Sequence, residues 1–234
     1  MPASFNEEAL KAQAIASRTY AMYKMKNSNG TYDLVTDKTN QVYITEDKMK
    51  KIWQENFDYY FEKIKKAVYD TKDLIMTCNG NVILSMYFAR SNGKTEDAIL
   101  VFGSNEEYLK SVESPEESLT SEVTISKDEF CNKLNISCDA INISNVLKSS
   151  SGRINSLNIN GKTFKGTEIR TLFDLKSTDF DISIGSEIKF VTKGYGHGVG
   201  MSQYGANKLA QNGKNYEEIL KHYYQNINIE KISV

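Results

Sequence analysis

The chain has 234 residues, of which 40% are hydrophobic and 25% are charged, and its net charge is −1; these values allow a folded core. Proteins that bind nucleic acids or anionic membranes by charge are normally basic, so both functions are disfavoured and no nucleic-acid partner is expected. The sequence contains no apolar run long enough to span a bilayer and no signal segment.

The first predicted element is a helix over residues 7–25, a stretch that contains no Gly or Pro. Ser4 and Glu7 have the spacing of a capping box at its start. Lys11 and Arg18 are seven residues apart, so they share one face of this helix. Their simplest interpretation is a pair of solvated surface charges.

Apolar and aromatic residues recur at helical spacing between Met49 and Val68, which predicts a helix whose aromatic stripe packs in the core. Residues 73–89 contain two apolar runs around an Asn-Gly pair at 79–80. Because this pair tolerates the positive φ angles of a type I′ turn, the segment predicts a hairpin. A polar loop follows the second run at residues 90–96.

Residues 105–150 are charged and mixed in pattern, and we expect them to form a peripheral, insertion-like segment. Within this segment, helices are predicted to start near Ser114 and to cover residues 127–134. A second hairpin is predicted from residue 153 onward, around the Asn-Gly pair at 160–161.

The last part of the chain combines alternating strands with short helices. The runs FDISI and EIKFVTKG alternate as strands do, and helices are predicted over 168–172, 202–211 and 216–224. The segregated order of helices and hairpins predicts an α+β fold. In this fold, β-hairpins pack with an N-terminal Ala-rich helix, an aromatic-striped helix and two C-terminal helices.

The three cysteines, Cys78, Cys131 and Cys138, cannot all pair within the chain. Cys131 and Cys138 could form a disulfide, but their spacing fits no common zinc pattern. Small buried thiols are the preferred interpretation.

The loop at residues 194–200 has a glycine at every second position around His197. Glycines let a backbone adopt conformations closed to other residues and let a ligand approach the main chain. Phosphate-binding loop patterns are absent, and a phosphate site would need a basic cluster that the sequence does not reveal. A functional role for His197 is favoured over a tight turn holding a satisfied histidine.

The glycine loop continues into a longer run, GYGHGVGMSQYGANKLAQNGKNYEEILKHYY. This run is similar to the C-terminal signature of the stage II sporulation protein D family. The run MPASFNEEALKAQAIASRTYA, the central YFARSNGKTEDAILVFGSNEEYLKSVESPEE, and GRINSLNINGKTFKGTEIRTLF with LKSTDF resemble its other blocks, in the family order. The resemblance implies one family-type domain over residues 1–234.

The resemblance implies a cell-wall enzyme without a cofactor. Members look like peptidoglycan lytic transglycosylases that act on denuded glycan strands, prepared by a partner amidase, and leave 1,6-anhydro-N-acetylmuramic ends during engulfment. They are typically held outside the cytoplasm by an N-terminal membrane anchor. Because the muramic 6-hydroxyl is the nucleophile, one Glu can serve as acid and then base.

The family's proposed catalytic Glu usually stands immediately before Met-Pro, whereas here Met1 is the first residue. We therefore expect an N-terminally truncated domain with weak or no activity. Glu8 and Glu96 are the nearest replacement candidates, and His197 could orient the acid or contact substrate.

Six polar residues of the family blocks are candidates for substrate binding: Arg18, Ser91, Thr95, Ser202, Gln203 and Tyr204. Some members place Cys and His in the stretch that matches residues 33–41, but Val35 and Asn40 stand here, so no metal is expected. The alternative function is a non-catalytic glycan-binding module that enhances an N-acetylmuramoyl-L-alanine amidase.

Overall fold

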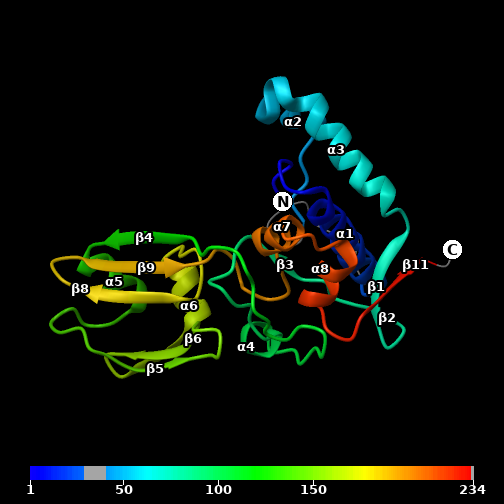
Figure 1. Cartoon of the computed structure of the whole chain (residues 1–234). Coiled ribbons are helices and arrows are strands. Elements are labelled where there is room, and N and C mark those ends of the chain that lie inside the picture. The colour runs from blue at the N-terminus through cyan, green and yellow to red at the C-terminus, as the bar shows by residue number, and fades with distance from the viewer. Residues whose placement is uncertain (29–40, 233–234) are drawn as a thin grey trace. The chain divides into compact units, whose positions relative to one another are not determined.

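The computed structural model describes residues 1–28 and 41–232, and it confirms the predicted α+β class (Figure 1). The chain divides into two compact units, Met1–Tyr87 with Ala206–Val234, and Phe88–Gly205. This division does not test the prediction of one family-type domain over residues 1–234, which stays a prediction. Within the described ranges, no helix is long and apolar enough to cross a membrane.

The first unit places helices around a three-stranded antiparallel sheet with the order β11-β1-β2 (Figure 1). The strands are β1 Leu74–Cys78, β2 Asn81–Val82 and β11 Asn228–Lys231. The helices are α1 Glu7–Lys26, α2 Glu46–Trp53, α3 Phe57–Asp70 and α8 Tyr216–Tyr223, with a 3₁₀ turn at Gln54–Asn56 and part of α7 Gln203–Gln211.

Helix α1 lies at the centre of this unit because its small residues allow close packing. Ala9, Ala12 and Ala16 are fully buried, and α1 contacts α3, α8 and β1. The cap differs from the predicted capping box: the side chain of Asn6, rather than Ser4, accepts the Glu8 N–H at 3.0 Å. Asn at this position satisfies one of the open backbone donors of the first turn.

Lys11 and Arg18 are not simple solvated charges, so that interpretation was wrong. Lys11 pairs with Glu8 at 2.9 Å and with Asp70 at 3.5 Å. The Arg18 Nη1 donates to the carbonyl oxygens of Thr71 at 2.7 Å and Leu74 at 2.9 Å. Both cations thereby tie α1 to the C-terminal end of α3 and the strand that follows it.

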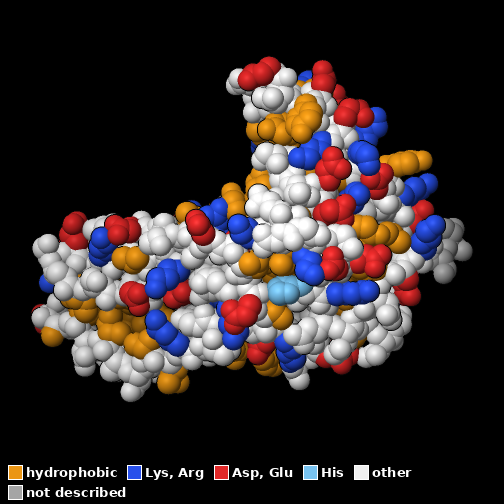
Figure 2. All heavy atoms as spheres, in the orientation of Figure 1, with side chains coloured by type: hydrophobic (Ala, Val, Ile, Leu, Met, Phe, Trp, Pro, Cys, Tyr) orange, Lys and Arg blue, Asp and Glu red, His pale blue; other side chains and the backbone are white. Residues whose placement is uncertain are grey.

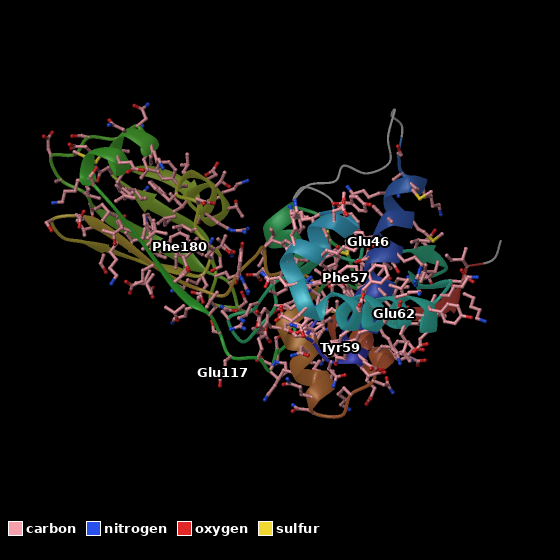
Figure 3. All side chains as sticks on the ribbon, turned by 90° about the horizontal axis from the view of Figure 1, so that it is seen from above. Glu46, Phe57, Tyr59, Glu62, Glu117 and Phe180 are labelled. Atoms are coloured by element: carbon pink, nitrogen blue, oxygen red, sulfur yellow. A yellow bond between two sulfur atoms is a disulfide. The ribbon has the colours of Figure 1, made fainter. Side chains whose placement is uncertain are left out.

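The aromatic stripe between Met49 and Val68 is helical, but it is divided into α2, a 3₁₀ turn and α3, with Gln54 at φ +47°. The prediction that it packs in the core was wrong, because α2 buries no residue and α3 buries only Ala67. Its rings instead stack along the helices, with centroids of Phe57 and Phe61 5.3 Å apart. Figure 3 shows Phe57 and Tyr59 on α3.

The first predicted hairpin is present, with Asn79 at φ +51° and Gly80 at φ +76° between β1 and β2. Its second strand stops at Val82 instead of reaching residue 89. Residues Tyr87–Phe88 form a separate strand, β3, which pairs with β10 Met201–Ser202.

The second unit contains two three-stranded antiparallel sheets, with the orders β4-β9-β8 and β5-β6-β7 (Figure 1). The strands are β4 Thr120–Ile125, β5 Ile143–Lys148, β6 Ile154–Ile159, β7 Lys162–Lys165, β8 Phe180–Ile184 and β9 Ile188–Lys193. The helices of this unit are α4 Ala98–Phe102, α5 Lys127–Leu134 and α6 Gly166–Leu172.

An aromatic cluster forms the core of this unit. Phe173 and Phe190 have ring centroids 4.9 Å apart, and Phe180 on β8 meets Phe190 edge-on at 6.0 Å (Figure 3). Residues 105–150, which the sequence placed at the periphery, supply Phe130, Cys131 and Leu134 to this cluster.

The helix predicted to start near Ser114 is absent from the described structure, so that prediction was wrong. Ser114 donates its N–H to the Gly93 carbonyl at 2.9 Å, and Glu113 forms a β-bridge with Lys94. The segment is held in an extended conformation by these long-range hydrogen bonds, which a local capping pattern does not reveal.

Cys131 and Cys138 form a disulfide, so the preferred interpretation of buried thiols was wrong for this pair. Cys78 is buried in β1. Disulfides form and persist in oxidising surroundings, which agrees with a location outside the cytoplasm.

Candidate functional site

The glycine loop is shaped by close backbone packing within the second unit. Gly194, Gly196, Gly198 and Gly200 all have positive φ, at 84°, 120°, 87° and 74°. A Cβ atom on Gly194 would lie 3.0 Å from the Arg90 carbonyl oxygen, and one on Gly196 would lie 2.7 Å from the Phe88 Cβ. The glycines therefore let the loop lie directly on residues 88–92.

Arg153 lies beneath this loop, where a Cβ on Gly198 would be 2.7 Å from its Cζ. Only 2% of Arg153 is exposed, and its Nη1 donates to the Lys94 carbonyl at 2.8 Å and to Ser151 Oγ at 2.9 Å. Burial lowers the pKa of Arg153, while the negative charges of Glu96 and Asp179 act in the opposite direction. A cation buried to this degree needs such compensation.

Glu96 is 1% exposed, and its carboxylate is engaged within the protein. Its oxygens accept hydrogen bonds from Ser151 Oγ at 2.7 Å, from Ser149 Oγ, and from the Asp97 N–H at 3.0 Å. The Glu96 N–H donates to the Gly198 carbonyl at 2.8 Å. Glu96 thus joins the glycine loop to the turn that carries Ser149 and Ser151.

Glu116 is a second buried carboxylate. It accepts hydrogen bonds from the Ser91 N–H at 2.7 Å, from Ser114 Oγ at 2.6 Å and from Ser202 Oγ. Burial alone would raise the pKa of Glu116, but the hydrogen bonds from Ser114, Ser202 and Ser91 outweigh it and hold the pKa below its ordinary value. The side chain of neighbouring Glu117 is exposed and points away from the ribbon (Figure 3).

These groups form a buried polar cluster that fastens the glycine loop to the rest of the second unit. We use this name for six residues: Ser91, Glu96, Glu116, Ser151, Arg153 and Ser202. All of them are at most 9% exposed. Each of these six residues forms hydrogen bonds within the protein. These hydrogen bonds account for the conformation of the backbone around them.

Three predicted substrate-binding residues, Ser91, Thr95 and Ser202, are buried. Thr95 Oγ1 accepts the Val112 N–H at 2.8 Å, and Ser202 Oγ accepts the Gly205 N–H at 3.2 Å at the start of α7. Their expected contact with substrate stays a prediction.

The other predicted residues of this unit lie nearer the surface. The His197 ring stands between Phe88 and exposed Phe102, with centroid distances of 5.6 and 5.4 Å, and its Nδ1 accepts the Val199 N–H at 3.1 Å. The Tyr204 ring lies 3.6 Å from the Arg90 Cζ. Gln203 is half-buried at the first position of α7.

Glu8 and Arg18 belong to the first unit, where both have structural partners. The Glu8 carboxylate pairs with Lys11 and accepts the Tyr216 N–H at 2.8 Å at the start of α8. Arg18 binds the carbonyls at the end of α3, and burial lowers its pKa. Catalytic or binding roles for these two residues stay predictions.

No group of three or more His, Cys, Asp or Glu side chains that could hold a metal ion occurs among the described residues. Val35 and Asn40, on which the expectation of no metal was based, lie outside the described residues.

Arg153 and Glu116 were missed by the sequence analysis, as were Tyr195 in the glycine loop and Arg90, its backbone partner. A charged residue in a polar context is usually exposed, so the residue type offered no signal for the burial of Arg153. All four residues did, however, fall within the blocks that carried the family resemblance.

Comparisons with known proteins agree with this resemblance. A family model described as "Stage II sporulation protein" matches residues 1–78. The chain is 38% identical to stage II sporulation protein D of Bacillus subtilis, over 99% of this chain and 71% of that protein, and 38% identical to the Bacillus amyloliquefaciens protein of the same name over the same shares. It is 29% identical to the amidase enhancer of Bacillus subtilis, over 96% of this chain and 38% of that protein. The chain therefore belongs to the stage II sporulation protein D family.

Proposed function

We propose that this chain is the glycan-binding and glycan-cleaving domain of a peptidoglycan lytic transglycosylase used in sporulation. It acts on denuded strands and forms 1,6-anhydro-N-acetylmuramic ends. The observation that carries the proposal is the similarity to stage II sporulation protein D over 99% of the chain. The reaction itself comes from the family resemblance of the four sequence blocks.

The accessible surface near the glycine loop supports sugar binding. Tyr195 and Phe102 are 43% and 47% exposed, and His197 and Tyr204 are half-buried beside them in the second unit. Aromatic faces bind the apolar faces of sugar rings, and the polar groups of Tyr and His add hydrogen bonds. A sugar ring stacked on these aromatic side chains would also find hydrogen-bonding partners in Gln203 and His197, which belong to the same unit.

The surroundings of the two candidate acids, Glu8 and Glu96, support slow cleavage of glycan by this chain. Glu8 is bound by Lys11 and by a backbone N–H, while Glu96 is nearly inaccessible and holds two serine hydroxyls. A general acid must reach the glycosidic oxygen directly or through one water. Glu96 does not satisfy this requirement as placed, and the partly exposed Glu8 carboxylate is already held by Lys11 and a backbone N–H. We therefore expect glycan binding to be easier to detect than glycan cleavage.

The same proposal includes the surroundings in which the domain works. A cell-wall amidase would supply the denuded strands, and an N-terminal anchor in a full-length protein would hold the domain at the membrane. The disulfide supports a position outside the cytoplasm.

The test combines binding and cleavage. Amidase-treated glycan strands are incubated with the chain, and bound protein and 1,6-anhydro ends are measured by sedimentation and mass spectrometry. We expect clear binding with few 1,6-anhydro ends. His197→Ala should weaken binding, whereas His222→Ala, at the only other histidine, serves as the matched control. Absence of binding to denuded strands would refute the proposal.

A second candidate function is supported by the similarity to a protein named amidase enhancer. In this case the chain would stimulate stem-peptide release by an amidase without cutting glycan itself. The rate of release from intact peptidoglycan, with and without the chain, separates the two. Stimulation without any 1,6-anhydro ends favours the enhancer.

A further inference from the structure

Two tyrosine rings, one in the glycine loop and one shortly after it, each have a cation over one face. Lys176 Nζ lies 5.0 Å from the Tyr195 ring centroid, and Arg90 Cζ lies 3.6 Å from the Tyr204 ring centroid. Both distances are within the range of cation–π attraction. We call these four residues, Lys176, Tyr195, Arg90 and Tyr204, the cation–tyrosine strip.

Backbone hydrogen bonds bring the strip together. Arg90 and Tyr195 exchange both of their backbone hydrogen bonds, at 3.0 and 2.7 Å, so the two side chains leave the same face of the pair. Gly196 N–H donates to the Lys176 carbonyl at 2.9 Å, and Tyr204 N–H donates to the Ala89 carbonyl at 3.1 Å. The strip is therefore contiguous and fixed by the main chain.

Among the residues that the structure describes, the cations of the strip form no ion pair with a carboxylate. Four lysines of the same unit form ion pairs: Lys94, Lys133, Lys148 and Lys189. In the described part of the chain, neither Arg90 nor Lys176 takes part in an ion pair, and neither does Arg170. Arg170 interacts electrostatically with Tyr195 and with Asp174. The strip therefore presents two cations without an ion pair, on a chain whose overall charge is −1.

The strip is accessible and already ordered. Tyr195 is 43% exposed, and Arg90 and Tyr204 are half-buried. An arginine stacked on a ring keeps N–H donors at the edge of its planar group, where they can bind a carboxylate. Because the rings restrain the cations beforehand, binding would cost less side-chain entropy than it would for free lysines.

A ligand that suits this arrangement has a flat apolar face and a carboxylate. On the proposed function, peptidoglycan strands supply both: the sugar rings stack, and the lactyl group of muramic acid ends in a free carboxylate once the stem peptide is removed. While the peptide is attached, that carboxyl is an uncharged amide. We propose that the cation–tyrosine strip is the subsite that recognises the lactyl carboxylate of denuded muramic acid.

The experiment measures the affinity of the full chain for three glycans by calorimetry. The first is the amidase-treated strand, the second is the same strand with its carboxylates coupled to methylamine, and the third is a chitin oligosaccharide. We expect the charged strand to bind about tenfold more tightly than the other two, since charge-assisted hydrogen bonds to an accessible carboxylate contribute on the order of one tenfold step.

Substitutions in the strip test whether its cations cause the preference for the charged strand. Arg90→Gln and Lys176→Gln should each reduce the preference about threefold, and together they should abolish it while chitin binding stays unchanged. Lys189→Gln is the matched control, because Lys189 is paired with Glu122 at 2.8 Å in the same unit. A double variant that keeps the wild-type preference overturns the proposal, as does wild-type protein that binds all three glycans equally. Failure to bind any of the three would instead overturn the proposed function on which it rests.

Discussion

The buried polar cluster and the cation–tyrosine strip lie in the same unit and share the same loop, yet they use charge in opposite ways. In the cluster, Arg153 and Glu96 are at most 2% exposed and hydrogen-bond to the protein itself. In the strip, Arg90 and Lys176 lie on aromatic faces and form no ion pair within the described residues. On our proposal, the polar residues of the cluster hold the shape of the site, while the neighbouring residues of the strip bind the ligand.

The largest expected effect is that of removing the buried cation. Arg153→Met should lower the free energy of unfolding by about 3 kcal/mol, because Glu96 would remain buried without its opposite charge. Chemical denaturation measures the loss. Arg90→Met, in the strip, is the comparison and should cost less than about 1 kcal/mol. Equal losses for the two arginines would contradict the distinction between the regions.

Glu116 gives a smaller effect with a defined pH dependence. Glu116→Gln should cost about 2 kcal/mol at neutral pH, because hydrogen bonds to a charged carboxylate are lost, while Glu117→Gln should cost almost nothing. The folded-state pKa of Glu116 is lowered from its ordinary value of 4.5, so its contribution is present above that pH and is lost as pH falls through the folded pKa. Denaturation at pH 7 and pH 3 checks this. The prediction is contradicted when the difference in the free energy of unfolding between wild type and Glu116→Gln is larger at pH 3 than at pH 7.

Two glycine substitutions separate the stability cost of a clash between the glycine loop and Arg153 from the cost of backbone strain. Gly198 and Gly213 have the same φ of +87°, but a Cβ on Gly213 would meet nothing within 4 Å, whereas one on Gly198 would meet Arg153. Gly213→Ala should cost about 1 kcal/mol through strain alone. Gly198→Ala should cost about 1–2 kcal/mol more, through displacement of the guanidinium. Equal costs in thermal unfolding would show that the loop does not press on Arg153.

The smallest expected stability effect is in the strip. Tyr195→Ala should change the free energy of unfolding by about 0.5 kcal/mol, the size of an exposed cation–π contact, while weakening glycan binding. Thermal unfolding and sedimentation with denuded strands measure the two properties. A large loss of stability with unchanged binding would place Tyr195 with the buried cluster.

The sequence predicted the features that depend on local pattern. Helix α1 and both hairpins follow from a Gly-free and Pro-free run and from two Asn-Gly pairs, whose conformations are decided within a few residues. Strand β4 was missed because its partner β9 is about 70 residues away, with Thr120 opposite Lys193. The exposure of the aromatic stripe and the Cys131–Cys138 disulfide also depend on packing that the spacing of residues does not contain.

The candidate site was predicted in part for the same reason. The glycine loop with His197 was recognised from its spacing, because alternating glycines are rare outside such loops. The burial of Arg153 and Glu116, and the stacking of Arg90 on Tyr204, arise when segments around residues 90, 116, 153 and 204 meet in space. No single-sequence pattern relates those segments to one another.

The most direct test of the account is the affinity for denuded glycan strands of two variants, Arg90→Gln and Ser151→Ala, measured at a temperature where both are folded. Arg90 belongs to the strip, and Ser151 hydrogen-bonds to Glu96 and Arg153 in the cluster. We predict that Arg90→Gln weakens binding while Ser151→Ala leaves it unchanged, although Ser151→Ala is the less stable protein. Unchanged binding by Arg90→Gln with loss of binding by Ser151→Ala would contradict the account.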